Sequence, residues 1–179
     1  MTATADKLNE AKYFLDRAKE SPFHTDAFRY NISAFLSASR SITFMMKKEF
    51  FSVPGFEKWY EKKVGEMRQD KFMKYLDRQR DITIHERPVQ SHPHVSLIEE
   101  TTGEGTKDLV VLYHLMGTGG ATVNVVRSRP LITTAKPTGK IRCCFDDILD
   151  EDVMTLCEKH IAKLSKITNE CESNFQAPT

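Results

Sequence analysis

The sequence predicts a mainly helical α+β protein, in which an antiparallel four-helix bundle is followed by a small antiparallel β-meander and a C-terminal helix. Apolar residues recur at helical spacing up to about residue 85, and this spacing returns after about residue 150. The stretch between them contains short runs rich in β-branched residues, which favour strands. The 179 residues are therefore expected to form a bundle over 1–90, a β-meander over 91–149 and a helix over 150–174 that packs back on the body.

Four helices are expected in the first part of the chain, over residues 6–20, 26–51, 56–69 and 72–85. Helix-breaking residues separate them, with Ser21-Pro22 after the first, Val53-Pro54-Gly55 after the second and Pro88 after the last. The second helix carries one long apolar stripe, made of Phe28, Ile32, Phe35, Ile42, Met46 and Phe50. Short loops between successive helices favour antiparallel packing.

After Pro88 the pattern changes from helices to strands. Gln90 to His94 is interpreted as a linker, and strands are expected at 95–98, 109–115, 122–126 and 141–145. The run from Gly117 to Gly120 predicts a turn. A last helix is expected to begin at Asp150 as its N-cap, with two acidic residues in the first turn, where they suit the helix dipole. Its expected apolar face contains Val153, Leu156, His160 or Ile161, Leu164 and Ile167.

Composition indicates an ordinary globular protein and a cytoplasmic location. No apolar run approaches the ~18 residues that a membrane-spanning helix needs. The four cysteines contain no CxxC pair, so they are interpreted as small buried side chains rather than metal ligands or disulfides. The net charge is +1 overall. It is unevenly distributed, since residues 1–90 hold 17 Lys+Arg against 13 Asp+Glu, and the rest hold 9 against 12. The first half is thus the better candidate for binding a polyanion.

One segment, Arg80-Asp81-Ile82-Thr83-Ile84-His85, combines residue types that suit the cleavage of RNA. In that reaction the 2′-hydroxyl attacks the adjacent phosphorus, which requires proton transfers and stabilisation of charge on the phosphoryl oxygens. His is suited to proton transfer because its ordinary pKa is about 6.5. Arg is suited to the oxygens because its guanidinium group is planar, permanently charged and bidentate.

This segment resembles the RNA-cleaving motif of the HEPN superfamily. HEPN domains are helical bundles in which an Arg, usually followed by a polar residue, precedes a His by a short interval near the end of a late helix. Here Asp81 follows Arg80, and four residues separate Arg80 from His85. Arg78 also fits, although Gln79 follows it. On an ideal helix His85 lies about 140° from Arg80 but only about 20° from Arg78, so both arginines remain candidates.

The resemblance implies a metal-independent endoribonuclease that leaves a 2′,3′-cyclic phosphate and works as a homodimer with a composite site. Arg80 would stabilise the phosphate, His85 would be the general acid or base, and Asp81 would orient one of them. Arg78 and Arg87 would bind the RNA. No metal ion and no cofactor are expected. The family also suggests a toxin–antitoxin or defence role, with an antitoxin or regulatory protein as a partner.

Two other interpretations remain open. In the first, the chain is a non-catalytic HEPN-like dimer that binds nucleotides or a partner protein, with the meander as its interaction surface. In the second, Arg80 and Asp81 belong to a solvated helix surface, and His85 is a residue favourable to the dipole at the helix C-terminus.

Overall fold

The computed structural model of the protein describes residues 1–98, 111–116, 120–125, 138–145 and 151–177. The described residues are mainly helical, which confirms that part of the predicted fold class. The chain divides into two compact units, one made of Met1–Gln90 with Met154–Thr179 and the other of Ser91–Val153.

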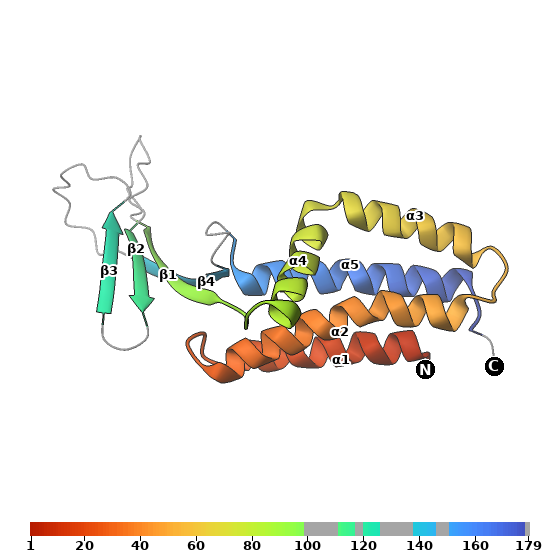
Figure 1. Ribbon diagram of the computed structural model, residues 1–179, viewed down its shortest axis with the longest axis horizontal. Coiled ribbons are helices and arrows are strands. Elements are labelled where there is room, and N and C mark those ends of the chain that lie inside the picture. The colour runs from red at the N-terminus through yellow and green to blue at the C-terminus, as the bar shows by residue number, and fades with distance from the viewer. Residues whose placement is uncertain (99–110, 117–119, 126–137, 146–150, 178–179) are drawn as a thin grey trace. The chain divides into compact units, whose positions relative to one another are not determined.

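The first unit contains four helices and nearly all of a fifth (Figure 1). Their bounds are α1 (Ala3–Glu20), α2 (Asp26–Phe50), α3 (Phe56–Gln69), α4 (Lys71–His85) and α5 (Val153–Asn174). The first four agree with the predicted helices within three residues. The largest difference is at the start of α1, where the Thr2 side chain accepts a hydrogen bond from the Ala5 N–H and caps the helix.

A carboxylate from α2 also caps the beginning of α1. Glu49 accepts hydrogen bonds from the backbone N–H groups of Ala3 and Thr4, both at 2.8 Å, and from the Thr4 hydroxyl at 2.6 Å. Burial opposes ionisation of Glu49, but these hydrogen bonds outweigh it and hold the pKa of the carboxyl below its usual value. The contact places the end of α2 beside the start of α1, so the two helices run antiparallel.

Side-chain contacts also define the direction of α5. Lys19 near the end of α1 pairs with Glu158 near the start of α5 at 3.1 Å, and the Thr2 hydroxyl contacts Glu172 near the end of α5. Helix α5 therefore runs antiparallel to α1. It is parallel to α2, because the Phe35 and His160 rings meet edge to face and Cys171 packs with Phe50 further along.

The third helix is attached to α5 by one aromatic cluster and two polar contacts. Phe56 is its one fully buried residue, and its ring lies 5.7 Å from that of Phe50 and 5.6 Å from that of Phe175. Glu170 accepts a hydrogen bond from Trp59 at 3.1 Å and pairs with Lys63 at 2.9 Å. Partly buried residues of α3, among them Tyr60, Val64 and Met67, line a cavity between the helices.

The second unit contains two antiparallel strand pairs. Strand β1 (Ser91–Ile98) pairs with β4 (Thr138–Phe145), with Ser91 opposite Phe145, and β2 (Val111–Met116) pairs with β3 (Gly120–Val125). The linker expected at Gln90 to His94 is wrong from Ser91 onward, because β4 is long enough to pair with the whole of β1. Pro93 of β1 is compatible with this pair, because a strand with a neighbour on one side only does not use the backbone N–H group of every residue. The expected strand and turn residues 109–110, 117–119 and 126 lie outside the described residues.

The start of the last helix differs from the prediction. Asp150 lies outside the described residues, and α5 begins at Val153, so Glu151 and Asp152 precede the helix and are not in its first turn. The Asp152 carboxylate instead accepts a hydrogen bond from the Cys143 backbone N–H at 3.0 Å. Asp152 therefore belongs to the connection between β4 and α5.

All four cysteines are buried and none forms a disulfide, as the sequence predicts. Burial raises the pKa of the Cys171 thiol to about 12, so this side chain behaves as a neutral, apolar group. None of the helices in the described ranges has the length and apolar character needed to cross a bilayer.

Candidate functional site

Helix α4 carries the predicted motif, and local chemistry defines both of its ends. The Asp70 carboxylate accepts hydrogen bonds from the N–H groups of Phe72 and Met73 and so acts as the N-cap. Asp70 also pairs with Lys163 of α5, and this hydrogen bond is the main reason why its pKa is held below the usual value. The helix ends at His85, three residues before Pro88. The motif therefore occupies the last two turns of a helix that is capped and tied to α5.

One face of α4 is exposed and carries mostly basic residues. These residues follow one another at intervals of three and four, and all are exposed: Lys71, Lys74, Arg78, Asp81 and His85. Side chains at this spacing lie on one side of a helix. The opposite side is buried through Met73, Leu76 and Gln79. We call the five exposed residues the α4 face.

The two candidate arginines lie on different sides of α4. Arg78 is exposed on the α4 face, about 20° around the helix from His85 and about 10 Å along its axis. Arg80 is partly buried, with 27% of its side chain exposed, and it lines a cavity between the helices. His85 is exposed and does not line that cavity. His85 therefore shares the exposed side of α4 with Arg78 rather than with Arg80.

Asp81 makes one of the two contacts expected of it. Arg80 donates a hydrogen bond from Nη1 to Oδ1 of Asp81 at 2.7 Å, so the expected contact is made with the arginine and not with the histidine. The Nε of Arg80 is buried and has no hydrogen-bond partner. Arg80 thus reaches from the edge of the cavity towards the α4 face.

Arg87 lies just beyond the helix and is exposed. It donates a hydrogen bond to Oε1 of Gln90 at 2.8 Å. Nothing in this arrangement prevents Arg87 from contacting a ligand on the outside of α4, because a single exposed hydrogen bond to an amide is easily exchanged.

Three residues at this site were not predicted from the sequence. Lys71 and Lys74 extend the α4 face towards its N-terminus, and their i, i+3, i+7 spacing with Arg78 could have revealed them. Arg40 of α2 pairs with Asp77 of α4 at 3.2 Å. No sequence signal indicates this pair, because its members are distant in the chain.

The charges of the α4 face are of the kinds that suit contact with phosphate groups. Three cations, one carboxylate and one imidazole share it, so it offers charge for phosphate oxygens and one group able to transfer a proton. Within the part of the chain that the structure describes, no group of three or more His, Cys, Asp or Glu residues is arranged to hold a metal ion.

Comparison with known protein families gives one match. The family described as bacteriophage lambda protein ea47 matches residues 1–98. The chain belongs to this family. The matched region includes α1 to α4 and β1, and so it contains the whole α4 face. Neither the curated proteins nor the solved structures contain a match to the chain.

Proposed function

We propose that the protein is a metal-independent endoribonuclease of HEPN type, which acts as a homodimer. The observation that supports the proposal is the α4 face, where His85, Arg78 and Asp81 are exposed together beside two lysines. In this proposal α4 belongs to a HEPN-like helical bundle. The second unit is an extension but not the predicted β-meander, because β1 pairs with β4 and not with the next strand in the sequence. The chain cleaves single-stranded or loop RNA by attack of a 2′-hydroxyl on the adjacent phosphorus.

The reaction explains why two copies are needed. The bond from phosphorus to the 5′-oxygen breaks as the bond to the 2′-oxygen forms, which leaves a 2′,3′-cyclic phosphate and a 5′-hydroxyl. One proton leaves the 2′-hydroxyl and another reaches the 5′-oxygen, so two proton-transfer groups serve the step best. The α4 face carries one histidine. Two copies of this face, opposed across a dimer axis, supply two.

Each motif residue has a separate role in the proposed site. His85 is the general acid or base, and Arg78 is the arginine best placed to bind the phosphate beside it. Arg80 binds the phosphate from the edge of the face, in the orientation that its hydrogen bond to Asp81 favours. Arg87 and the two lysines contact neighbouring phosphates, where they add affinity without sequence preference.

The test is cleavage of a mixed RNA substrate in the presence of EDTA, with analysis of the product ends. His85→Ala is expected to lower the rate at least about 100-fold, because general acid–base groups contribute that much. His24→Ala is the matched control, since His24 is also exposed but lies in the connection between α1 and α2, and it is expected to cleave normally. Arg78→Ala and Arg80→Ala identify the motif arginine by the larger loss.

The same samples distinguish the proposal from its alternatives. Retained cleavage by His85→Ala, or ends other than a cyclic phosphate and a 5′-hydroxyl, would overturn the proposed site. A folded dimer with no cleavage would favour the non-catalytic HEPN-like dimer that binds nucleotides or a partner protein. If the enzyme acts as a toxin or defence effector, its expression slows growth and His85→Ala does not, and an antitoxin or regulatory protein restores growth.

A further inference from the structure

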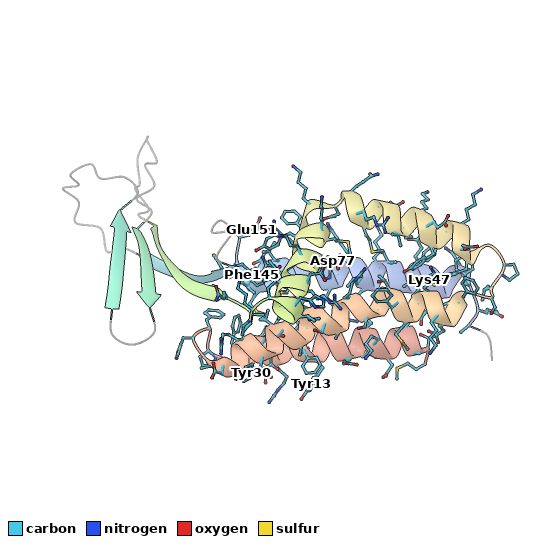
Figure 2. The ribbon with its side chains drawn as sticks, viewed as in Figure 1. Tyr13, Tyr30, Lys47, Asp77, Phe145 and Glu151 are labelled. Atoms are coloured by element: carbon cyan, nitrogen blue, oxygen red, sulfur yellow. The ribbon has the colours of Figure 1, made fainter. Side chains whose placement is uncertain are left out.

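A cavity of about 900 Å³ lies within the helical unit, bordered by α2, α3, α4 and α5. Its floor is apolar and fully buried, through Leu36, Phe56, Leu76 and Leu164. Two residues of the lining are labelled in Figure 2, Asp77 of α4 and Lys47 of α2. A cavity of this size suits a small organic ligand, since ligand pockets are about 300–1,000 Å³.

Two buried polar atoms without partners lie on residues of this lining. They are the Nε of Arg80 and the Nδ1 of His160. Buried polar atoms are nearly always hydrogen-bonded, and those that are not are explained best by a missing water, ion or ligand. The His160 side chain is only 8% exposed. Both atoms are covered by their neighbours, so a ligand in the cavity contacts the accessible groups beside them.

The lining is basic on balance, with five Lys or Arg residues against Glu57, Glu61 and Asp77. The Tyr60 hydroxyl donates a hydrogen bond to the Thr43 carbonyl at 3.0 Å. Burial raises the pKa of this phenol, while its hydrogen bond with Thr43 and the charges of Arg40 and Arg68 act in the opposite direction. Both arginines line the same cavity. Arg40 shares its charge with Asp77 at 3.2 Å. For Arg68, by contrast, no ion pair is found within the described part of the chain.

Aromatic and basic groups also meet elsewhere on the same lining. The guanidinium of Arg40 lies 4.6 Å from the centre of the Phe44 ring, and Phe44 is 55% exposed. Such a stacked arginine keeps its outer edge available for an acidic group. Beside Tyr60, the partly buried Val64 and Met67 provide an apolar wall.

We propose that this cavity binds a small aromatic anion, that is, a planar ring that carries a phosphate or a carboxylate. The acidic group binds Arg68 and Arg40, and the ring packs against Tyr60 and the apolar floor. Lys74 and Arg80 line this cavity and also belong to the proposed RNA site. Variants of Arg68 and Arg40 therefore test the cavity without changing the proposed catalytic residues.

The experiment is isothermal titration of the full chain with four probes: 1-naphthyl phosphate, 1-naphthoate, uncharged 1-naphthol and inorganic phosphate. Saturable binding is expected for one or both naphthyl anions. It should be at least about tenfold tighter than for naphthol or inorganic phosphate, because the ring and the charge are both recognised. The tighter of the two anions identifies whether the site prefers a phosphate or a carboxylate.

Two variants locate the binding. Arg68→Ala removes an exposed cation and is expected to weaken anion binding about tenfold, as loss of one charge-assisted hydrogen bond does. Arg40→Ala is expected to weaken it as well, because Arg40 is the second cation of the lining proposed to bind the acidic group. Arg17→Ala is the matched control, because Arg17 is exposed on α1 and outside the lining. Fluorescence of Trp59, the one tryptophan of the chain, verifies that each variant is folded.

If neither naphthyl anion shows saturable binding, the proposal is overturned. That result is the one expected if the cavity instead holds an apolar segment of a partner protein. Binding that Arg68→Ala and Arg40→Ala leave as strong as in the control would overturn it too. Neither result depends on RNA cleavage, because every titration is carried out without RNA. The proposed ribonuclease activity and the proposed ligand site can therefore fail independently.

Discussion

His160 should make the stability of the helical unit depend on pH, and His160→Leu should remove that dependence. Burial lowers the pKa of His160 from 6.5 to about 4, while the charge of Asp70 acts to raise it and that of Lys163 to lower it further. The folded state therefore resists protonation, whereas the unfolded chain accepts a proton near its ordinary pKa. Because the unfolded state binds more protons in this range, stability is fully present above pH 6.5 and falls as the pH drops towards 4.

The size of the effect follows from the two pKa values. A difference of about 2.5 pH units corresponds to about 3 kcal/mol in all, of which about 2 kcal/mol is lost between pH 7 and pH 5. The interval above pH 5 is the useful one, because it lies above the range in which carboxylates such as Glu49 and Glu170 are protonated. Leu is close to His in volume, so the variant should differ from the wild type by less than about 1.5 kcal/mol at pH 7.

The assay is urea unfolding followed by Trp59 fluorescence at several pH values from 7 to 5. The free energy of unfolding should decrease with falling pH in the wild type and much less in His160→Leu. His24→Leu is the control, because His24 is exposed, and it should keep the wild-type slope. Equal slopes for the wild type and His160→Leu would refute the reasoning, since they would mean that His160 is protonated equally easily in both states.

Two further predictions concern the framework of the unit. Glu49→Gln should lower the free energy of unfolding by about 1–2 kcal/mol at pH 7, because it weakens the charge-assisted hydrogen bonds to Ala3 and Thr4. Folding lowers the pKa of Glu49, so its contribution to stability is present above its ordinary pKa and disappears as the pH falls through its pKa in the folded state. The difference in unfolding free energy between the variant and the wild type should therefore shrink in acid. A difference that stays constant with pH would argue against the cap. Gly55→Ala should cost about 1–2 kcal/mol in the same urea assay, because Gly55 has a φ of 83° and this left-handed conformation strains a residue with a Cβ. An unchanged midpoint would show that the turn before α3 can relax.

Much of the fold could be predicted because local signals agree with tertiary packing. Helical spacing and the breakers at Pro22, Pro54 and Pro88 predict α1 to α4 within three residues. The errors arise where a distant contact overrides the local signal. Ser91 to His94 join β1 because β4 lies alongside them, and Asp152 precedes α5 while its carboxylate accepts from Cys143.

The candidate site was predictable in part for the same reason. The sequence indicates a helix that contains Arg78, Arg80, Asp81 and His85, and helix geometry alone places His85 closer to Arg78. It does not indicate that Arg80 borders a cavity, because the other sides of that cavity come from α2, α3 and α5. His160 was expected only as a member of an apolar face, and nothing near it in the chain reveals its unpartnered nitrogen.

The sequence by itself determined which segments are helices and which residues of α4 share a side, because both depend on the period of the helix. Tertiary structure decided which side of α4 is covered, and which of its residues border the open cavity between the helices. The physical reason is that the environment of a side chain depends on neighbouring elements. Their approach is set by contacts such as Glu49 with Thr4 and Glu170 with Lys63, between residues far apart in the chain.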